Sequence, residues 1–118
     1  MKSFRELRVW QRSMDLVEKV YFLTREFPKH ETLCSDQSTA PRGYSIPSNI
    51  AEGHTREHIK EYLHHLSMAQ ASLAEVETQL EIATRLKYLE SDQLKASLLD
   101  IGALGKQLYA LRNALVRI

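Results

Sequence analysis

An apolar repeat runs without interruption through residues 55–87 and restricts this chain to folds that bury one face of a very long helix. Its members recur in steps of three and four: Ile59, Tyr62, Leu66, Ala69, Leu73, Val76, Leu80 and Ala83. Such spacing places apolar side chains on one side of an α-helix. The segment predicts a rod of roughly 45 Å at 1.5 Å per residue, with Thr55 as its N-cap and Glu57 in its first turn.

The C-terminal segment repeats this pattern. Its apolar positions are Leu94, Ile101, Leu104, Leu108, Leu111, Leu115 and Ile118, with Ser97 in the one polar slot. Ser91 is the expected N-cap of this helix. Because only Tyr88, Leu89 and Glu90 connect the two segments, the sequence predicts that they are antiparallel neighbours.

The N-terminal segment carries two adjacent apolar stripes, which together predict a wide core-facing side of a helix. The first is Trp10, Met14, Val17 and Tyr21, and the second is Leu16, Val20, Leu23 and Phe27. The run from Ser3 to Glu6 matches a capping box, and Pro28 is the expected stop.

Residues 29–53 predict a further helix that ends at Glu52, with Gly53 as its stop. Its start is open, because Pro41 fits a first turn, whereas Pro47 either follows a Ser45 cap in a short helix or kinks a longer one. The small residues Ser45, Ser48 and Ala51 indicate a close-packing surface.

Four amphipathic helices with short connections predict an all-α, antiparallel up-down-up-down four-helix bundle, with helix two short or kinked at Pro41 or Pro47. At 118 residues, the chain predicts a single domain, 1–118. The lone cysteine, Cys34, excludes an intrachain disulfide and is consistent with the cytoplasm. The sequence contains no run of 18 or more apolar residues, so no membrane-spanning helix is predicted.

The stretch YSIPSNIAEG at 44–53 combines with three further motifs: Phe4 with Leu7–Gln11, Phe27–Glu31, and Ser72–Leu80. Together they resemble the bacterial four-helix-bundle family encoded in intervening sequences of the large-subunit ribosomal RNA gene. The accessory variability protein of diversity-generating retroelements is similar. The motif residues of interest are Ser45, Ile46, Pro47, Asn49, Ile50, Ala51, Glu52, Gly53, Glu75 and Glu77.

This resemblance implies a homopentamer without enzyme activity or cofactor, with suggested roles that involve RNA or a nucleic-acid-processing protein. It also implies that Glu75 and Glu77 pair between helices or subunits rather than act in catalysis. The chain departs from the family at 37–43, where QSTAPRG replaces a run similar to Gln-Leu-Arg-Arg-Ala-Ala.

The residue types argue against catalysis. Cys34 has no base beside it in sequence, and the four glycines are too scattered for a phosphate-binding loop. His54, His58, Glu61 and His65 have metal-compatible spacing, and Glu61 with His64 matches half of a di-iron motif. Because the apolar repeat places these histidines outward, a solvated face is the preferred interpretation and no metal is expected.

A net charge of +1 is low for a nucleic-acid-binding protein, so binding would depend on a local patch. The bundle topology brings three basic segments to one end of the molecule. We call this end the basic pole, and its residues are Lys2, Arg5, Arg8, Arg12, Arg56, Lys60, Lys106, Arg112 and Arg117. The alternative is that these charges only complement helix dipoles and maintain solubility.

Several apolar residues lie away from the core-facing repeats: Val9, Leu63, Leu86, Leu98 and Leu99. They predict a lateral interface, which must be heterologous if copies close into a ring. The favoured hypothesis is therefore a cytoplasmic, non-enzymatic, ring-forming accessory module for RNA. A protein interaction scaffold without nucleic acid is the alternative, and a metal-binding bundle is a distant third.

Overall fold

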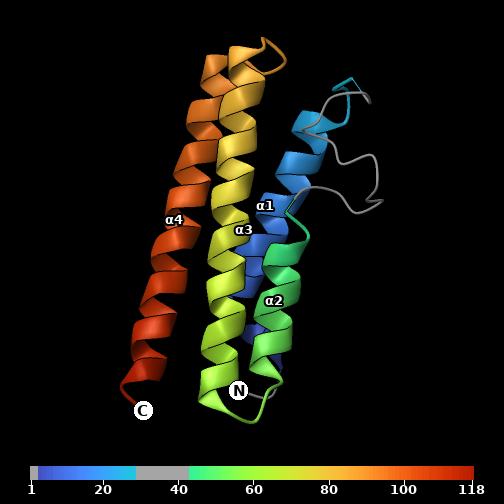
Figure 1. Ribbon diagram of the computed structural model, residues 1–118. Helices are drawn as coiled ribbons and strands as arrows, with labels where there is room; N and C mark the ends of the chain where they lie inside the picture. The colour runs from blue at the N-terminus through green and yellow to red at the C-terminus, as the bar shows by residue number, and fades with distance from the viewer. Residues whose placement is uncertain (1–2, 29–42) are drawn as a thin grey trace.

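The computed structural model describes residues 3–28 and 43–118, which form four α-helices and no strand. A 3₁₀ turn, η1 (Phe4–Glu6), precedes α1 (Arg8–Thr24), α2 (Ser45–His54), α3 (Ile59–Arg85) and α4 (Ser91–Val116). Successive helices alternate in direction (Figure 1). The predicted all-α up-down-up-down bundle is confirmed. Lys2, Cys34, Pro41 and the family departure at 37–42 lie outside the described residues.

The core lies along the shared axis of the four helices. Its fully buried side chains come from every helix: Val20, Ile46, Ile50, Leu66, Val76, Leu80, Leu104 and Leu108. The apolar repeats of α3 and α4 therefore face inward as predicted. Only their ends differ, because Ile59 and Ile118 are exposed where the bundle ends.

Helix α1 is shorter than predicted at both ends. The capping box is present, but Ser3 and Glu6 cap η1, and extended Leu7 separates this turn from α1. The helix ends at Thr24 rather than at Pro28. Val9, which we assigned to a lateral interface, is buried in the core.

The boundary between α2 and α3 differs from the prediction. Helix α2 continues through Gly53 to His54, and Thr55 is its C-cap rather than the N-cap of α3. The Thr55 amide donates to the carbonyls of Ala51 and Glu52, while the Thr55 hydroxyl donates to the Glu52 carbonyl at 2.7 Å. The Thr55 hydroxyl could have capped the end of α2 or the start of α3. Because residues 55–58 form a turn between the helices, it caps the end of α2.

The start of α2 supports the short-helix alternative for Pro47. This proline is the third helical residue, where the missing N–H has no intrahelical partner to lose. Ser45 is the first helical residue and does not cap the helix. Its hydroxyl instead donates to Ser72 Oγ of α3 at 2.6 Å.

The α3–α4 connection is short, as predicted, and both of its ends are capped. Lys87 has a positive φ of 71°, and the amides of Lys87 and Tyr88 bond back to the carbonyls of Thr84 and Ala83. This is a Schellman motif with lysine at the left-handed position. Glu90, not Ser91, is the N-cap of α4 and forms a capping box with Gln93.

No helix among the described residues is both long and apolar enough to cross a membrane.

Candidate functional site

The motif segment 45–53 lies between α1 and α3. Ile46 and Ile50 are 0% exposed and project into the core. Pro47 is also buried, whereas exposed Ser48 and half-buried Ala51 line a hollow beside α1. The predicted core-facing ridge is present. The small residues do not form the predicted close-packing surface, because Ser45 and Ser48 are exposed.

Gly53 is a close-packing position within α2. A Cβ added there would lie 2.8 Å from His65 Cβ and 2.9 Å from Tyr62 Cδ1, closer than carbon atoms pack in protein interiors. Glycine therefore allows α2 and α3 to approach here. The prediction that Gly53 terminates the helix is wrong.

Asn49 links α2 to His65 of α3. Its amide nitrogen donates to the Ser45 carbonyl at 2.9 Å, and its Oδ1 lies 3.0 Å from His65 Nδ1. Because the Asn49 oxygen can only accept, Nδ1 carries the proton in this contact. The Glu52 carboxylate lies 3.8 Å from the same nitrogen.

The His65 side chain is only 11% exposed, so its predicted outward orientation is wrong. His54 packs edge-on against Tyr62, with ring centroids 6.0 Å apart. Burial raises the pKa of the Tyr62 phenol above its ordinary value. Within residues 3–28 and 43–118, no three His, Cys, Asp or Glu side chains gather closely enough to hold a metal ion.

Only part of the predicted basic pole lies together: Arg12, Lys106 and Arg112 have other environments, and Lys2 is outside the described residues. Both chain ends and the α2–α3 turn lie at one end of the bundle (Figure 1). The exposed basic residues there are Arg5, Arg8, Arg56, Lys60 and Arg117. Arg56 lies 3.9 Å from the Glu61 carboxylate. Beside this pair is a hollow of about 430 Å³, which is also lined by Lys60, His64 and His65.

Three of the predicted basic residues have other environments. Arg12 is half-buried and lines a small hollow with Asp15, Lys19 and Asp100. Arg112 is half-buried and donates to Gln70 Oε1 of α3. Lys106 lies ten residues before Val116, the last residue of α4. It is therefore about 15 Å along the helix from the end that forms the pole. Arg112 therefore links α4 to α3, and Arg12 lies beside α4 rather than at the pole.

Glu75 is exposed and Glu77 is half-buried on α3. They lie two positions apart on the helix and therefore point in different directions. Neither forms an ion pair with another described residue.

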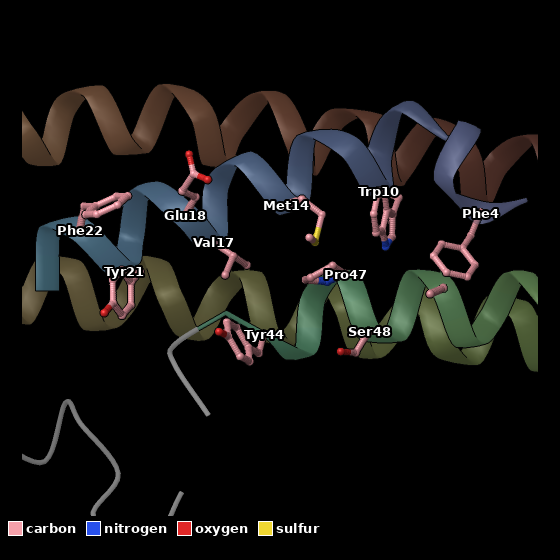
Figure 2. Close-up of a pocket in the computed structure, with 11 residues that line it drawn as sticks. Phe4, Trp10, Met14, Val17, Glu18, Tyr21, Phe22, Tyr44, Pro47 and Ser48 are labelled. Carbon is pink, nitrogen blue, oxygen red and sulfur yellow. The ribbon is translucent and has the colours of Figure 1, made fainter. Parts of the chain in front are cut away.

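A long apolar groove separates α1 from α2 and encloses about 600 Å³. Trp10, Met14, Val17 and Tyr21 point from α1 toward α2 (Figure 2). Phe4, Phe22, Tyr44, Pro47, Ser48, Ala51 and Glu18 complete its lining. The sequence analysis did not predict this groove. The apolar stripe from Trp10 to Tyr21 indicates it, but we assigned that stripe to the core.

The groove exists because the two stripes of α1 have different surroundings. Leu16 and Val20 of the second stripe are buried, whereas Met14 and Tyr21 of the first are 44% and 48% exposed. An exposed apolar surface of this kind marks an interaction site more often than an isolated apolar residue does.

The family model described as 23S rRNA-intervening sequence protein matches residues 5–110. No curated protein matches the chain.

Proposed function

The chain belongs to the family of 23S rRNA-intervening sequence proteins, and we propose that it is a non-enzymatic accessory module that binds structured RNA at its basic pole. The observation that carries this proposal is the convergence of both chain ends with the α2–α3 turn (Figure 1). This convergence exposes Arg5, Arg8, Arg56, Lys60 and Arg117 at one end. Arginine and lysine are the side chains that contact phosphate most often.

Self-assembly is part of the proposal. Glu6, Glu57 and Glu61 lie among the basic residues of the pole, so one copy offers few unopposed positive charges. Several poles on one assembly would engage several phosphates of one RNA, which raises overall affinity without any new contact. We propose a homopentameric ring in the cytoplasm, as the family resemblance implies.

The proposal contains no catalytic step. The best-defined polar cluster is formed by Asn49, His65 and Glu52, and it lies between two packed helices. Asn49 uses its amide group to join Ser45 and His65. Hydrogen bonding across the α2–α3 contact accounts for these side chains.

Fluorescence anisotropy of a structured RNA, titrated at several salt concentrations, tests the proposal. The pole variant is Arg5→Gln/Arg8→Gln/Arg56→Gln. The matched control, Arg25→Gln/Arg85→Gln/Lys95→Gln, removes three exposed charges at the opposite end of the bundle. Each lost phosphate contact should reduce the slope of log K against log salt by about 0.7–0.9.

We expect the pole variant to lose at least about tenfold in affinity at low salt, while the control stays close to wild type. Equal losses in both variants would show that overall charge, not the pole, attracts the RNA. Wild-type affinity in the pole variant would refute the proposed interface.

A protein interaction scaffold is the second candidate, and the apolar groove between α1 and α2 favours it. Absence of RNA binding at low salt, together with an intact assembly, would select this alternative.

A further inference from the structure

Helix α4 carries an apolar seam and a second seam of mixed character. The first faces the core through Ile101, Leu104 and Leu108. The second faces outward in steps of three and four, and all of its members are exposed. This outward seam consists of Leu99, Gly102, Lys106, Tyr109, Asn113 and Val116. Leu99 and Tyr109 are 76% and 62% exposed, which is unusual for large apolar side chains on a regular repeat.

The groove between α1 and α2 has a matching composition. Its lining is apolar and largely aromatic, and Glu18 is the one charged residue in it. Glu18 lies on the rim, with its carboxylate turned away from α2 (Figure 2). The outward seam carries three large apolar side chains, Leu99, Tyr109 and Val116, and Lys106 is its one charged residue. Neither Glu18 nor Lys106 forms an ion pair with another described residue.

We propose that the outward seam of α4 in one copy docks into the α1–α2 groove of a second copy. This inference rests on the self-assembly in the proposed function and names its two surfaces. Lys106 of the seam meets Glu18 at the groove rim, and the apolar side chains of the seam cover the exposed aromatic lining.

The spacing along both helices allows these contacts to form together. Met14 and Phe22 lie one turn on either side of Glu18, about 6 Å along α1. Gly102 and Tyr109 lie about one turn on either side of Lys106. A register that pairs the two charges therefore places apolar or small residues against apolar residues in both directions.

Gly102 gives the seam room for a close approach. A Cβ added there would meet no atom within 4 Å, so nothing among the described residues of its own chain requires a glycine. Small residues at helix–helix contacts let two backbones approach closely. In the proposed assembly, the groove wall of the second copy would lie against Gly102 and make the close contact that is absent within one chain.

Helix α4 and the α1–α2 groove lie on different sides of the bundle (Figure 1), so the proposed contact is heterologous. A pair of copies joined in this way leaves one seam and one groove free, and further copies add until the ends meet. The apolar contacts supply the affinity of such an interface. The Glu18–Lys106 pair fixes its register, because rim charges act mainly on specificity and association rate.

Site-directed cross-linking tests this arrangement while it leaves in place the apolar contacts that supply the affinity. A Cys34→Ser background removes the only native cysteine. Chains that carry Glu18→Cys and chains that carry Lys106→Cys are co-expressed and treated with a short bis-maleimide. Each variant expressed alone serves as one control. Co-expression of Glu18→Cys with Glu81→Cys, an exposed position on α3, serves as the other.

Cross-linked dimer should be at least tenfold more abundant in the Glu18→Cys and Lys106→Cys mixture than in any control. Light scattering on the same samples reports the assembled mass. Equal cross-linking in mixture and controls, with a multimeric mass, would overturn the named surfaces and leave the proposed self-assembly standing. A monomeric mass at micromolar concentration would overturn both.

Discussion

Replacing Gly53 with alanine should destabilise the bundle, although alanine is the better helix former. The new Cβ would lie 2.8 Å from His65 Cβ and 2.9 Å from Tyr62 Cδ1. His65 Cβ is attached directly to the α3 backbone, so a side-chain rotation cannot relieve the contact. Either α2 or α3 must move, and Ile50 and Leu66 pack in the core on the same two helices.

Two opposing terms set the magnitude. Overpacking in a well-packed region costs about 1–3 kcal/mol, and we expect the upper half of this range because the contact involves a Cβ. Alanine recovers about 1 kcal/mol of helix propensity relative to glycine. The net loss is therefore about 1–2 kcal/mol, which lowers the Tm of a chain of this size by roughly 3–10 °C.

Gly105→Ala is the matched control, because Gly105 is also a helical glycine. Its added Cβ would lie 3.6 Å from Leu73 Cδ2, an ordinary van der Waals distance. This variant should match or exceed wild-type stability by up to about 1 kcal/mol. Thermal unfolding followed by circular dichroism at 222 nm compares the two. If Gly53→Ala were as stable as Gly105→Ala, close helix approach would not be the reason for glycine at position 53.

Three further substitutions test other local features. Lys87→Gly should raise the free energy of unfolding by about 1 kcal/mol, because a lysine side chain is strained at positive φ; an unchanged urea midpoint would contradict this. Asn49→Ala should lower the free energy of unfolding by about 1–2 kcal/mol, because His65 then loses a hydrogen-bond partner at a poorly exposed site. Unchanged NMR chemical shifts of the His65 ring in this variant would refute the contact. The pKa of Tyr62 is raised in the folded state, so the folded protein keeps the phenol proton to higher pH than the unfolded chain does. Wild-type stability should therefore fall as the pH rises above about 10, and Tyr62→Phe should make this fall in Tm less steep. Parallel wild-type and Tyr62→Phe curves would contradict that expectation.

Much of the fold could be predicted from local patterns. The repeat through Leu66, Leu73 and Leu80 is long enough to identify both the helix and its buried face. The short link before Ser91 left an antiparallel neighbour as the only arrangement. The same topology brings the start of α1, the α2–α3 turn and the end of α4 to one end of the bundle, as the sequence predicted.

The predictions failed where one residue type serves two purposes. Glycine both ends helices and allows close approach, so Gly53 could not be assigned without the position of α3. Threonine caps either end of a helix, and Thr55 closes α2 because the chain leaves helical geometry at residues 55–58. Arg112 is charged and was placed at the pole, yet its side chain reaches Gln70 between two helices.

By itself, the sequence determined which side chains share a helix face, because the period of 3.6 residues is a local property of the chain. Only the tertiary structure decided which of those faces are covered. In α1, Leu16 and Val20 meet the core, whereas Met14 and Tyr21 border an open groove. In α3, His65 turns toward Asn49 of α2. Burial depends on the distance between helices that are remote in sequence, and no local pattern contains that distance.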